Sequence, residues 1–384
     1  METLPSQHRF CNQSEAHAAT LKHFLTIVVT TSPIPSMPST ALLEALFRSL
    51  QLTPALPSCH LIITADGVGT VVSDAEKPNY KKSKIQGKDI AKYTAYVENI
   101  RRLLESPSFS DFKSTELLAL SEWKGFSGAV RAAVESVKTP FVMVMQHDQL
   151  LLDQIDVLSI IKALQRHSSI VKYVGLPSRT TTVGYARRIQ HRYGISLQPF
   201  NVPELEVPLM PLLMWYDKPH IVCREHLKDF VFNPEKSGID FRPGEFIEDV
   251  LGQHQLDDIK RNGLGAHAKY GTFVLDTARP LVYHLSGRKA EASAPEASDS
   301  SPDGSSGAPL DPDELAGENS GTRSFIAAVE GLRAPQSPEA PPLAPGSEAA
   351  PSYKFRGVCY RCGQKGHSFR YCSQRSTAEG RGGG

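Results

Sequence analysis

Residues 139–145, Thr-Pro-Phe-Val-Met-Val-Met, give the clearest indication of the fold of this chain. Five apolar residues follow the proline without a polar residue at any alternate position. Such a run predicts a strand that is buried on both faces, and strands of this kind are typical of parallel sheets covered by helices. The run leads directly into Gln146-His-Asp148-Gln149, so polar and charged side chains are expected at the carboxyl end of this strand.

Strands and helices alternate in the sequence before this run. Apolar periodicity predicts strands at residues 25–30, 60–64 and 116–120, and helices at residues 41–50, 90–104 and 128–137. Strands separated by helices in this order predict an α/β fold, with a mostly parallel sheet flanked by helices. Because ligands of such sheets bind beyond the carboxyl ends of the strands, site residues are expected directly after them.

The composition of the chain changes at about residue 288. The net charge of the 384 residues is +1, but residues 290–350 contain eleven Asp and Glu, two Arg and no Lys. Since residues 289–351 hold few large apolar side chains, burial cannot offset the entropy of ordering them, and they are predicted to form a disordered acidic linker. Residues 324–333 are an exception, and they are either a transient helix or an anchor for a protein partner.

The C-terminal region carries four metal-ligand residues at close spacing, Cys359, Cys362, His367 and Cys372. Zn²⁺ favours four tetrahedral thiolate or imidazole ligands, so this set predicts a closed, structural zinc site. In so short a segment, metal binding must supply most of the folding free energy, about 10 kcal/mol or more. The spacing resembles the CCHC zinc knuckle of retroviral and cellular proteins. The resemblance implies a single-stranded nucleic acid as partner, RNA more than DNA.

The residues around these ligands agree with such a partner. Tyr360 and Phe369 offer rings on which bases can stack, and Arg361, Lys365 and Arg370 offer contacts to phosphate. One knuckle buries little surface, so its binding is expected to be weak and strongly dependent on salt. The alternative is a knuckle that contacts protein.

The chain is therefore expected to have five parts. They are a flexible N-terminus (1–23), an α/β domain (24–288), a disordered linker (289–351), a zinc knuckle (352–375) and an Arg/Gly tail (376–384). The sequence shows neither a signal-peptide pattern nor an apolar run long enough to span a membrane, which predicts an intracellular protein of the cytoplasm or nucleus. The scattered Cys11, Cys59 and Cys223 suit reduced thiols in that setting.

Four short matches in the α/β domain follow one another in a familiar order. They are Thr30-Thr-Ser-Pro33, Asp66, Gly125–Val134 and Val142–Gln149. Together they resemble the GT-A type of nucleotide-sugar glycosyltransferase, a Rossmann-related fold, and family two in particular. The resemblance implies that Thr30 lies in the nucleotide-binding turn and that Asp66 holds the uracil or its ribose. It also implies that Asp148 stands where the family carries a metal-binding Asp-x-Asp motif.

The same resemblance implies further roles. Mn²⁺ or Mg²⁺ would neutralise charge on the diphosphate leaving group, and His147 or His284 would complete a metal shell that has a single carboxylate here. Glu248-Asp249 corresponds to the acidic pair near the acceptor, with Asp249 as the general base and Glu248 as the second choice. Arg188 is a candidate contact for phosphate.

Two functions remain open at this point. The first is an inverting glycosyltransferase that uses a nucleotide sugar and that the knuckle tethers to RNA or to a protein. The second is a non-catalytic, glycosyltransferase-like scaffold whose activity is nucleic-acid or protein binding. The missing second carboxylate beside Asp148 favours the scaffold, whereas the intact Glu248-Asp249 pair favours the enzyme.

Overall fold

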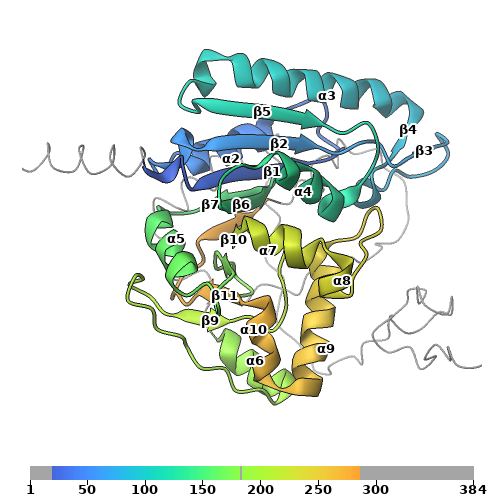
Figure 1. Ribbon diagram of the computed structural model, residues 1–384. Helices are drawn as coiled ribbons and strands as arrows, with labels where there is room; N and C mark the ends of the chain where they lie inside the picture. Colours follow the sequence, from blue (N-terminus) through green and yellow to red (C-terminus); the bar gives the residue numbers. More distant parts are fainter. Residues whose placement is uncertain (1–19, 182–183, 286–384) are drawn as a thin grey trace, which may run out of the picture. The chain divides into compact units, whose positions relative to one another are not determined.

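The computed structural model describes residues 20–181 and 184–285, which form an α/β domain (Figure 1). Its strands are β1 Leu25–Thr31, β2 His60–Ala65, β3 Thr70–Val72, β4 Lys84–Gln86, β5 Ser114–Ala119, β6 Phe141–Gln146, β7 Gln149–Leu151, β8 Tyr173–Gly175, β9 Leu209–Pro211, β10 His220–Cys223, β11 Thr272–Leu275 and β12 Val282–His284. Its α-helices are α2 Ala41–Leu50, α3 Gly87–Glu105, α4 Gly125–Ser136, α5 Val157–Arg166, α6 Tyr185–Tyr193, α7 Arg224–His226, α8 Pro234–Ser237, α9 Gln253–Asn262 and α10 His267–Tyr270. Short 3₁₀ or π turns are η1 Leu56–Ser58, η2 Tyr80–Lys82, η3 Pro107–Phe109, η4 Leu227–Val231, η5 Glu248–Gly252 and η6 Leu264–Ala266.

Eight strands form the central sheet, in the order β5-β2-β1-β6-β10-β8-β11-β9. The neighbours from β5 to β6 are all parallel, and so are β8 and β11. β10 runs antiparallel to both β6 and β8, and β9 runs antiparallel to β11. The expected α/β class with a mostly parallel sheet is thus confirmed in its coarse form, but the sheet is mixed. Each strand and helix predicted between residues 25 and 145 is present, within a few residues of the expected bounds.

β1 and β6 lie side by side in the middle of the sheet, and every residue of β1 is buried. Their side chains alternate between two hydrophobic cores, one on each face. Ile27 and Met143 belong to the first core, whereas Val28 and Val144 belong to the second. The run after Pro140 is apolar throughout because both faces of its strand are covered.

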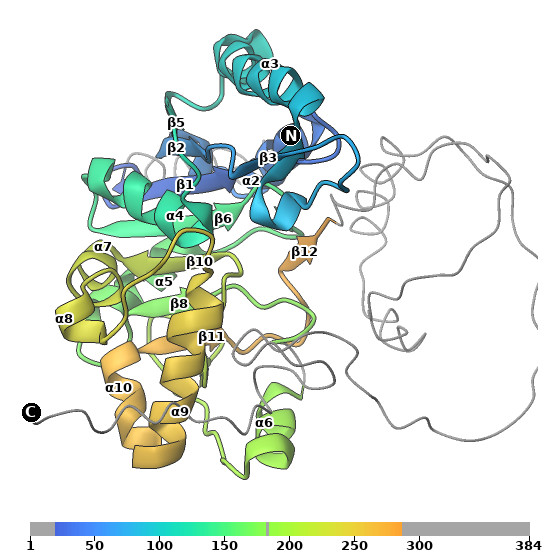
Figure 2. The same cartoon turned by 90° about the vertical axis from the view of Figure 1, so that its right-hand side faces the viewer.

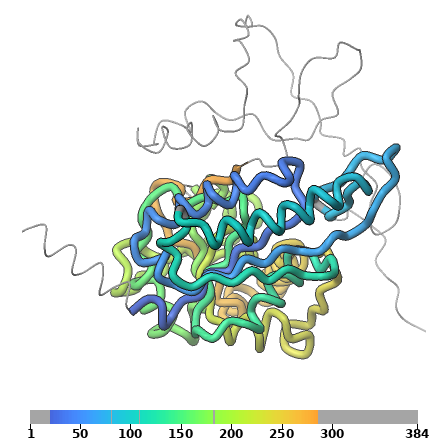
Figure 3. The backbone as a smooth tube through the Cα atoms, turned by 90° about the horizontal axis from the view of Figure 1, so that it is seen from above, coloured from blue at the N-terminus to red at the C-terminus, as the bar shows by residue number. Residues whose placement is uncertain are grey.

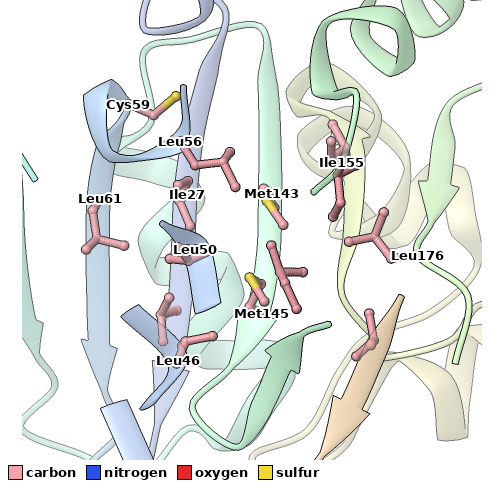
Figure 4. Close-up of a cluster of buried hydrophobic side chains, with 14 of the residues drawn as sticks. Ile27, Leu46, Leu50, Leu56, Cys59, Leu61, Met143, Met145, Ile155 and Leu176 are labelled. Atoms are coloured by element: carbon pink, nitrogen blue, oxygen red, sulfur yellow. The ribbon is translucent and has the colours of Figure 1, made fainter. Parts of the chain in front are cut away.

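Different helices supply the two cores. α2, α3 and α5 pack on the first face, with residues such as Leu46, Tyr96 and Ile160. α4, α6 and α9 pack on the second face, with residues such as Val130, Ile189 and Leu256. Figure 2 shows α2 and α4 on opposite sides of β1, and Figure 3 follows the same backbone from above. Figure 4 shows part of the first core, where Leu46 and Leu50 of α2 face Ile27 and Met145.

Two small sheets lie beside the large one. β3 pairs with β4, and β12 pairs with β7. The second pairing sets His284 opposite Gln149, so the end of the domain returns to the carboxyl end of β6. Among the helices of the described part, none is both long and apolar enough to cross a membrane.

Two buried histidines predict that the domain is sensitive to acid. Burial lowers the pKa of His220 to about 4 and the pKa of His226 to about 3. Below about pH 6.5 these two imidazoles bind protons in the unfolded chain but stay neutral in the folded domain. Their contribution to the free energy of unfolding is therefore fully present above about pH 6.5 and is lost as the pH falls toward their pKa values in the folded state. We expect these two histidines to lower the free energy of unfolding by about 3 kcal/mol between pH 7 and pH 5, while buried Asp217, whose raised pKa acts in the opposite direction, offsets part of the drop measured by urea denaturation.

The variant His220→Gln provides the control. It should flatten the pH dependence by about half, because His226 still contributes in the same direction. An unchanged slope in the variant would contradict the assignment of this acid sensitivity to His220.

Candidate functional site

A cleft opens where the central parallel strands end. Its floor is formed by residues 30–32 after β1, by Asp66 after β2 and by residues 146–148 after β6. It encloses about 520 Å³ of empty space, part of it open to solvent. The position of the cleft is the one at which parallel sheets bind ligands. Four residues that the sequence analysis named for this site line the cleft, namely Thr30, Asp66, His147 and Asp148.

Asp66 is a buried carboxylate that binds backbone. Its Oδ1 accepts the N–H groups of Gly67 at 3.0 Å and Lys124 at 2.8 Å, and its Oδ2 accepts the N–H of Gly125 at 2.9 Å. Because Gly125 begins α4, Asp66 satisfies donors at the start of that helix, which its own preceding residue does not cap. Burial raises the pKa of the Asp66 carboxyl, although the three N–H donors act in the opposite direction. Its carboxylate thus holds β2 and α4 together.

Asp148 and His284 lie in contact just beyond the carboxyl end of β6. Asp148 Oδ2 lies 3.3 Å from His284 Nε2, and the Leu285 N–H donates to the carbonyl of Asp148 at 2.7 Å. The pairing of β12 with β7 produces this contact between residues 136 positions apart. Across residues 20–181 and 184–285, no three His, Cys, Asp or Glu side chains gather as a metal-binding group. Of the residues that line the cleft, Asp66 and Asp148 carry carboxylates and His147 carries an imidazole. Asp66 binds backbone N–H groups, and His284, which is not a lining residue, contacts Asp148.

Asp217 connects the acidic pair to the end of β6, and the sequence did not single it out. Its backbone N–H donates to Glu248 Oε2 at 3.2 Å, while its own Oδ2 accepts the Glu248 N–H at 3.0 Å. Its carbonyl accepts the side-chain amides of Gln146 at 2.8 Å and Gln149 at 3.3 Å. Burial, and then the nearby carboxylates of Glu248 and Asp249, raise the pKa of Asp217 well above its usual value.

The two acidic residues after Ile247 differ in their surroundings. Glu248 is half-buried and turns toward Asp217, whereas Asp249 is exposed to solvent. Both belong to the π turn η5, and neither lines the cleft that holds Asp148. The hydrogen-bond chain through Asp217 is what joins Glu248 to that cleft. The expectation that put Asp249 first as the base rests on the family's motif alone, since it is Glu248 that has these contacts.

The wall of the cleft opposite the strand ends forms where two loops cross. The Gly244 N–H donates to the carbonyl of Lys124 at 3.1 Å. The backbones are so close that a Cβ on Gly125, at φ +70°, would lie 2.3 Å from the Cα of Gly244. A Cβ on Gly244 would in turn lie 2.4 Å from the ring of Trp123. Both glycines are therefore required by this crossing.

Aromatic rings cover the crossing on the cleft side. Phe126 and Phe246 stack with ring centroids 5.5 Å apart and planes 10° apart, and both line the cleft with Trp123. Ser83 also lines it, in a left-handed backbone conformation with φ 48°. Non-glycine residues held in that region often belong to functional sites. The turn that contains Ser83 closes locally, since the Ser83 N–H donates to the carbonyl of Tyr80 at 3.1 Å. The sequence carried no signal for Ser83 as a site residue, because only the fold brings this turn to the cleft.

Arg188 does not reach the cleft. It is exposed on α6, and its guanidinium donates to the carbonyl of Thr180 at 2.8 Å. Arg188 lies on α6 and is not among the residues that line the cleft with Asp148, and its suggested role as a phosphate contact stays a prediction. The predicted zinc ligands, nucleic-acid residues, acidic linker and tail lie outside the described residues.

Comparison with known proteins gives distant structural likenesses. The sequence matches no described protein family and no curated protein. The crystal structure of S. aureus TarS has 12% sequence identity and a TM-score of 0.37, covering 68% of this chain and 36% of that one. The crystal structure of S. aureus TarS 1-349 in complex with UDP-GlcNAc has 11% sequence identity and a TM-score of 0.39. It covers 68% of this chain and 58% of that one.

A mannosyltransferase is among the other likenesses. PcManGT from Pyrobaculum calidifontis, in complex with GDP-Man and Mn²⁺, has 11% identity and a TM-score of 0.33, covering 58% of this chain and 53% of that one. This chain thus spans between about a third and three-fifths of the length of these structures. They are likenesses at a distance, and the function proposed below rests on the chain's own residues.

Proposed function

We propose that residues 24–288 form a nucleotide-sugar-dependent, inverting glycosyltransferase domain. The observation that carries the proposal is the meeting of Thr30, Asp66 and Asp148 in one cleft, with His284 brought to Asp148 from the end of the domain. The sequence resemblance assigned roles in one site to these four residues, which are far apart along the chain. Strand ends of a parallel sheet are also suitable platforms for a nucleotide, because packing fixes their positions.

The donors at the strand ends fit a divalent cation that is shared with the substrate. Mg²⁺ and Mn²⁺ sites often use one or two protein carboxylates and take further oxygen ligands from substrate phosphates and water. Asp148 and His284, 3.3 Å apart, would hold such an ion. When bound, the cation would neutralise charge on the diphosphate leaving group.

Glu248 and Asp249 are the candidates for the base that activates the acceptor. An inverting transfer needs a base that accepts the proton of the acceptor hydroxyl. Glu248 is held by two hydrogen bonds to Asp217, which is linked to β6 through Gln146 and Gln149. We propose Glu248 as the base that this network positions, with Asp249, exposed beside it, as the alternative from the motif.

The test is a thermal-shift panel on the full chain. UDP-, GDP- and CDP-sugars are added with and without Mn²⁺, and we expect one donor class to raise the melting temperature by several degrees only when Mn²⁺ is present. Asp148→Asn should remove the Mn²⁺-dependent part of the shift, because the amide lacks the negative charge that attracts the cation. Glu248→Gln should keep the shift and lose sugar transfer.

The scaffold alternative gives a different result in the same panel. It predicts no shift with any sugar nucleotide, in the presence or absence of Mn²⁺, for a protein that is otherwise folded. That outcome would rule out the transferase. If the rise in melting temperature persists in Asp148→Asn, the domain binds the nucleotide sugar, but Asp148 does not hold a metal ion for it.

We also propose, from the ligand spacing alone, that Cys359, Cys362, His367 and Cys372 bind one structural Zn²⁺ and that the knuckle binds single-stranded RNA. Cys362→Ser should lower the zinc content of the purified protein from one ion per chain to near zero. It should also weaken binding to a single-stranded oligonucleotide at least tenfold at low salt. Equal affinity in the variant would mean that another part of the chain contacts RNA.

A further inference from the structure

A second hollow lies against the other side of the loop that contains Trp123. This outer groove runs between α4 and the segment of residues 232–243, which contains α8, and it encloses about 880 Å³ of empty space, again partly open to solvent. One face of α4 forms its first wall, with Lys124, Gly128 and Arg131 spaced at helical intervals. The groove is thus larger than the cleft at the strand ends, and the proposed transferase chemistry makes no use of it.

Two contacts join α4 to neighbouring segments beside the outer groove. At the start of α4, the Ser127 N–H donates to the carbonyl of Glu245 at 3.2 Å. Near the end of α4, Lys228 Nζ lies 3.2 Å from Glu135 Oε2. Lys124 and Glu135, which both line the groove, lie about 16 Å apart along the helix axis, and this is the length of the groove along α4.

The groove combines an apolar floor with a cationic rim. Phe232 is buried and Phe241 half-buried, and their rings meet edge to face with centroids 5.8 Å apart. Lys124, Arg131 and Arg242 are exposed at the edges, and none of these three forms an ion pair within the described part of the chain. Of the two acids in the lining, Glu135 is already paired with Lys228. Such a surface fits an amphipathic segment with negative charge around it.

The chain itself contains a segment of this kind. In residues 324–333, Phe325, Val329 and Leu332 recur at the spacing of one helical face. As a helix, these ten residues would measure about 15 Å, close to the length of the groove. Residues 311–318, just before them, contain four acidic and no basic side chains. Both the apolar spacing and the charge therefore complement the outer groove.

The stretch of chain between the α/β domain and residues 324–333 is long enough for these residues to reach the outer groove. Thirty-eight residues separate Leu285, the last described residue, from Ser324. A flexible chain of that length spans about 35 Å on average and much more when extended, so it can reach any face of a domain of this size. A tether of this kind also gives an effective concentration of about 1 mM, so that even a weak contact would be occupied.

We propose that the outer groove is the docking site of residues 324–333 of the same chain, with Phe325 and Val329 against the phenylalanine floor and the preceding acidic residues facing Lys124, Arg131 and Arg242. This contact does not depend on the proposed transferase activity. It gives the apolar segment, which is otherwise isolated within the acidic linker, a partner in its own protein.

Hydrogen exchange measured by mass spectrometry on the full chain tests the proposal. We expect amides of residues 324–333 to exchange at least tenfold more slowly than those of residues 336–350, which lack such apolar spacing. Arg131→Glu combined with Arg242→Glu should abolish this difference. Conversely, Phe325→Ser combined with Val329→Ser should speed the exchange of the amides in the segment of residues 232–243.

Charge-matched and concentration controls complete the experiment. Arg101→Glu combined with Arg102→Glu makes the same change of charge on α3 and should leave the protection intact. The proposal is overturned if residues 324–333 exchange as fast as the rest of the linker in the unmodified chain. It is equally overturned if the groove variant, still folded by its melting temperature, keeps the protection. Protection that grows with protein concentration would assign the groove to a second copy and not to the same chain.

Discussion

Replacing Gly125 by alanine is expected to destabilise the domain by about 4 kcal/mol or more, a large share of the roughly 5–15 kcal/mol by which single domains are stable. Two effects add. The residue has φ +70°, a conformation that costs a side chain about 1 kcal/mol or more. The new Cβ would also lie 2.3 Å from the Cα of Gly244, so one of two backbones must move. The measurement is the free energy of unfolding in urea.

Gly194→Ala is the matched control for this prediction. Gly194 has the same φ of +70°, but nothing lies within 4 Å of a Cβ built on it. The control therefore isolates the conformational cost, about 1 to 3 kcal/mol, from the steric one. Equal losses of stability in the two variants would show that the crossing of the loops at Gly125 and Gly244 tolerates a methyl group.

Replacing Asp66 by alanine is expected to destabilise the domain by about 3 kcal/mol or more, since hydrogen bonds to a charged group contribute about 1.5 to 3 kcal/mol each. Three backbone N–H groups would lose their acceptor, two of them at residues 124 and 125, where α4 begins. Unfolding in urea, followed by circular dichroism, measures the loss.

Asp111→Ala serves as the comparison for Asp66. Asp111 is exposed and accepts a single bond, from the side chain of Gln51 at 2.7 Å, so its removal should change the stability by less than about 1 kcal/mol. The result also separates two roles for Asp66. If Asp66→Ala keeps its stability but loses the response to sugar nucleotides, the carboxylate serves a ligand and not the start of α4.

The first half of the fold could be predicted from the sequence because its signals are local. The strand after Pro140 is apolar at every position since it is buried on both faces, and α3 and α4 show their helical periodicity without help from distant residues. The antiparallel β10 left no such signal. Its four residues pair with β6 and β8 only because the chain returns to the sheet after the long segment that contains α6.

The candidate site divides in the same way. Asp66 and Asp148 could be named because each directly follows a strand that is recognisable in sequence. Asp217 could not, since its importance comes from a backbone N–H, a carbonyl and a carboxyl that meet Glu248, Gln146 and Gln149 in space. Arg188 was named from its residue type alone, and its phosphate role stays a prediction, since it lies on α6 outside the lining of the cleft.

Trp123 gives the protein a natural optical reporter. The chain contains two tryptophans, and Trp215 is fully buried, with 0% of its surface exposed. Trp123 is half-buried and lines both the cleft at the strand ends and the outer groove. Quenchers dissolved in water should therefore reach one indole and spare the other, and a spectral change on adding a ligand can be assigned to Trp123. A single unlabelled sample can thus show by fluorescence whether either hollow has been filled.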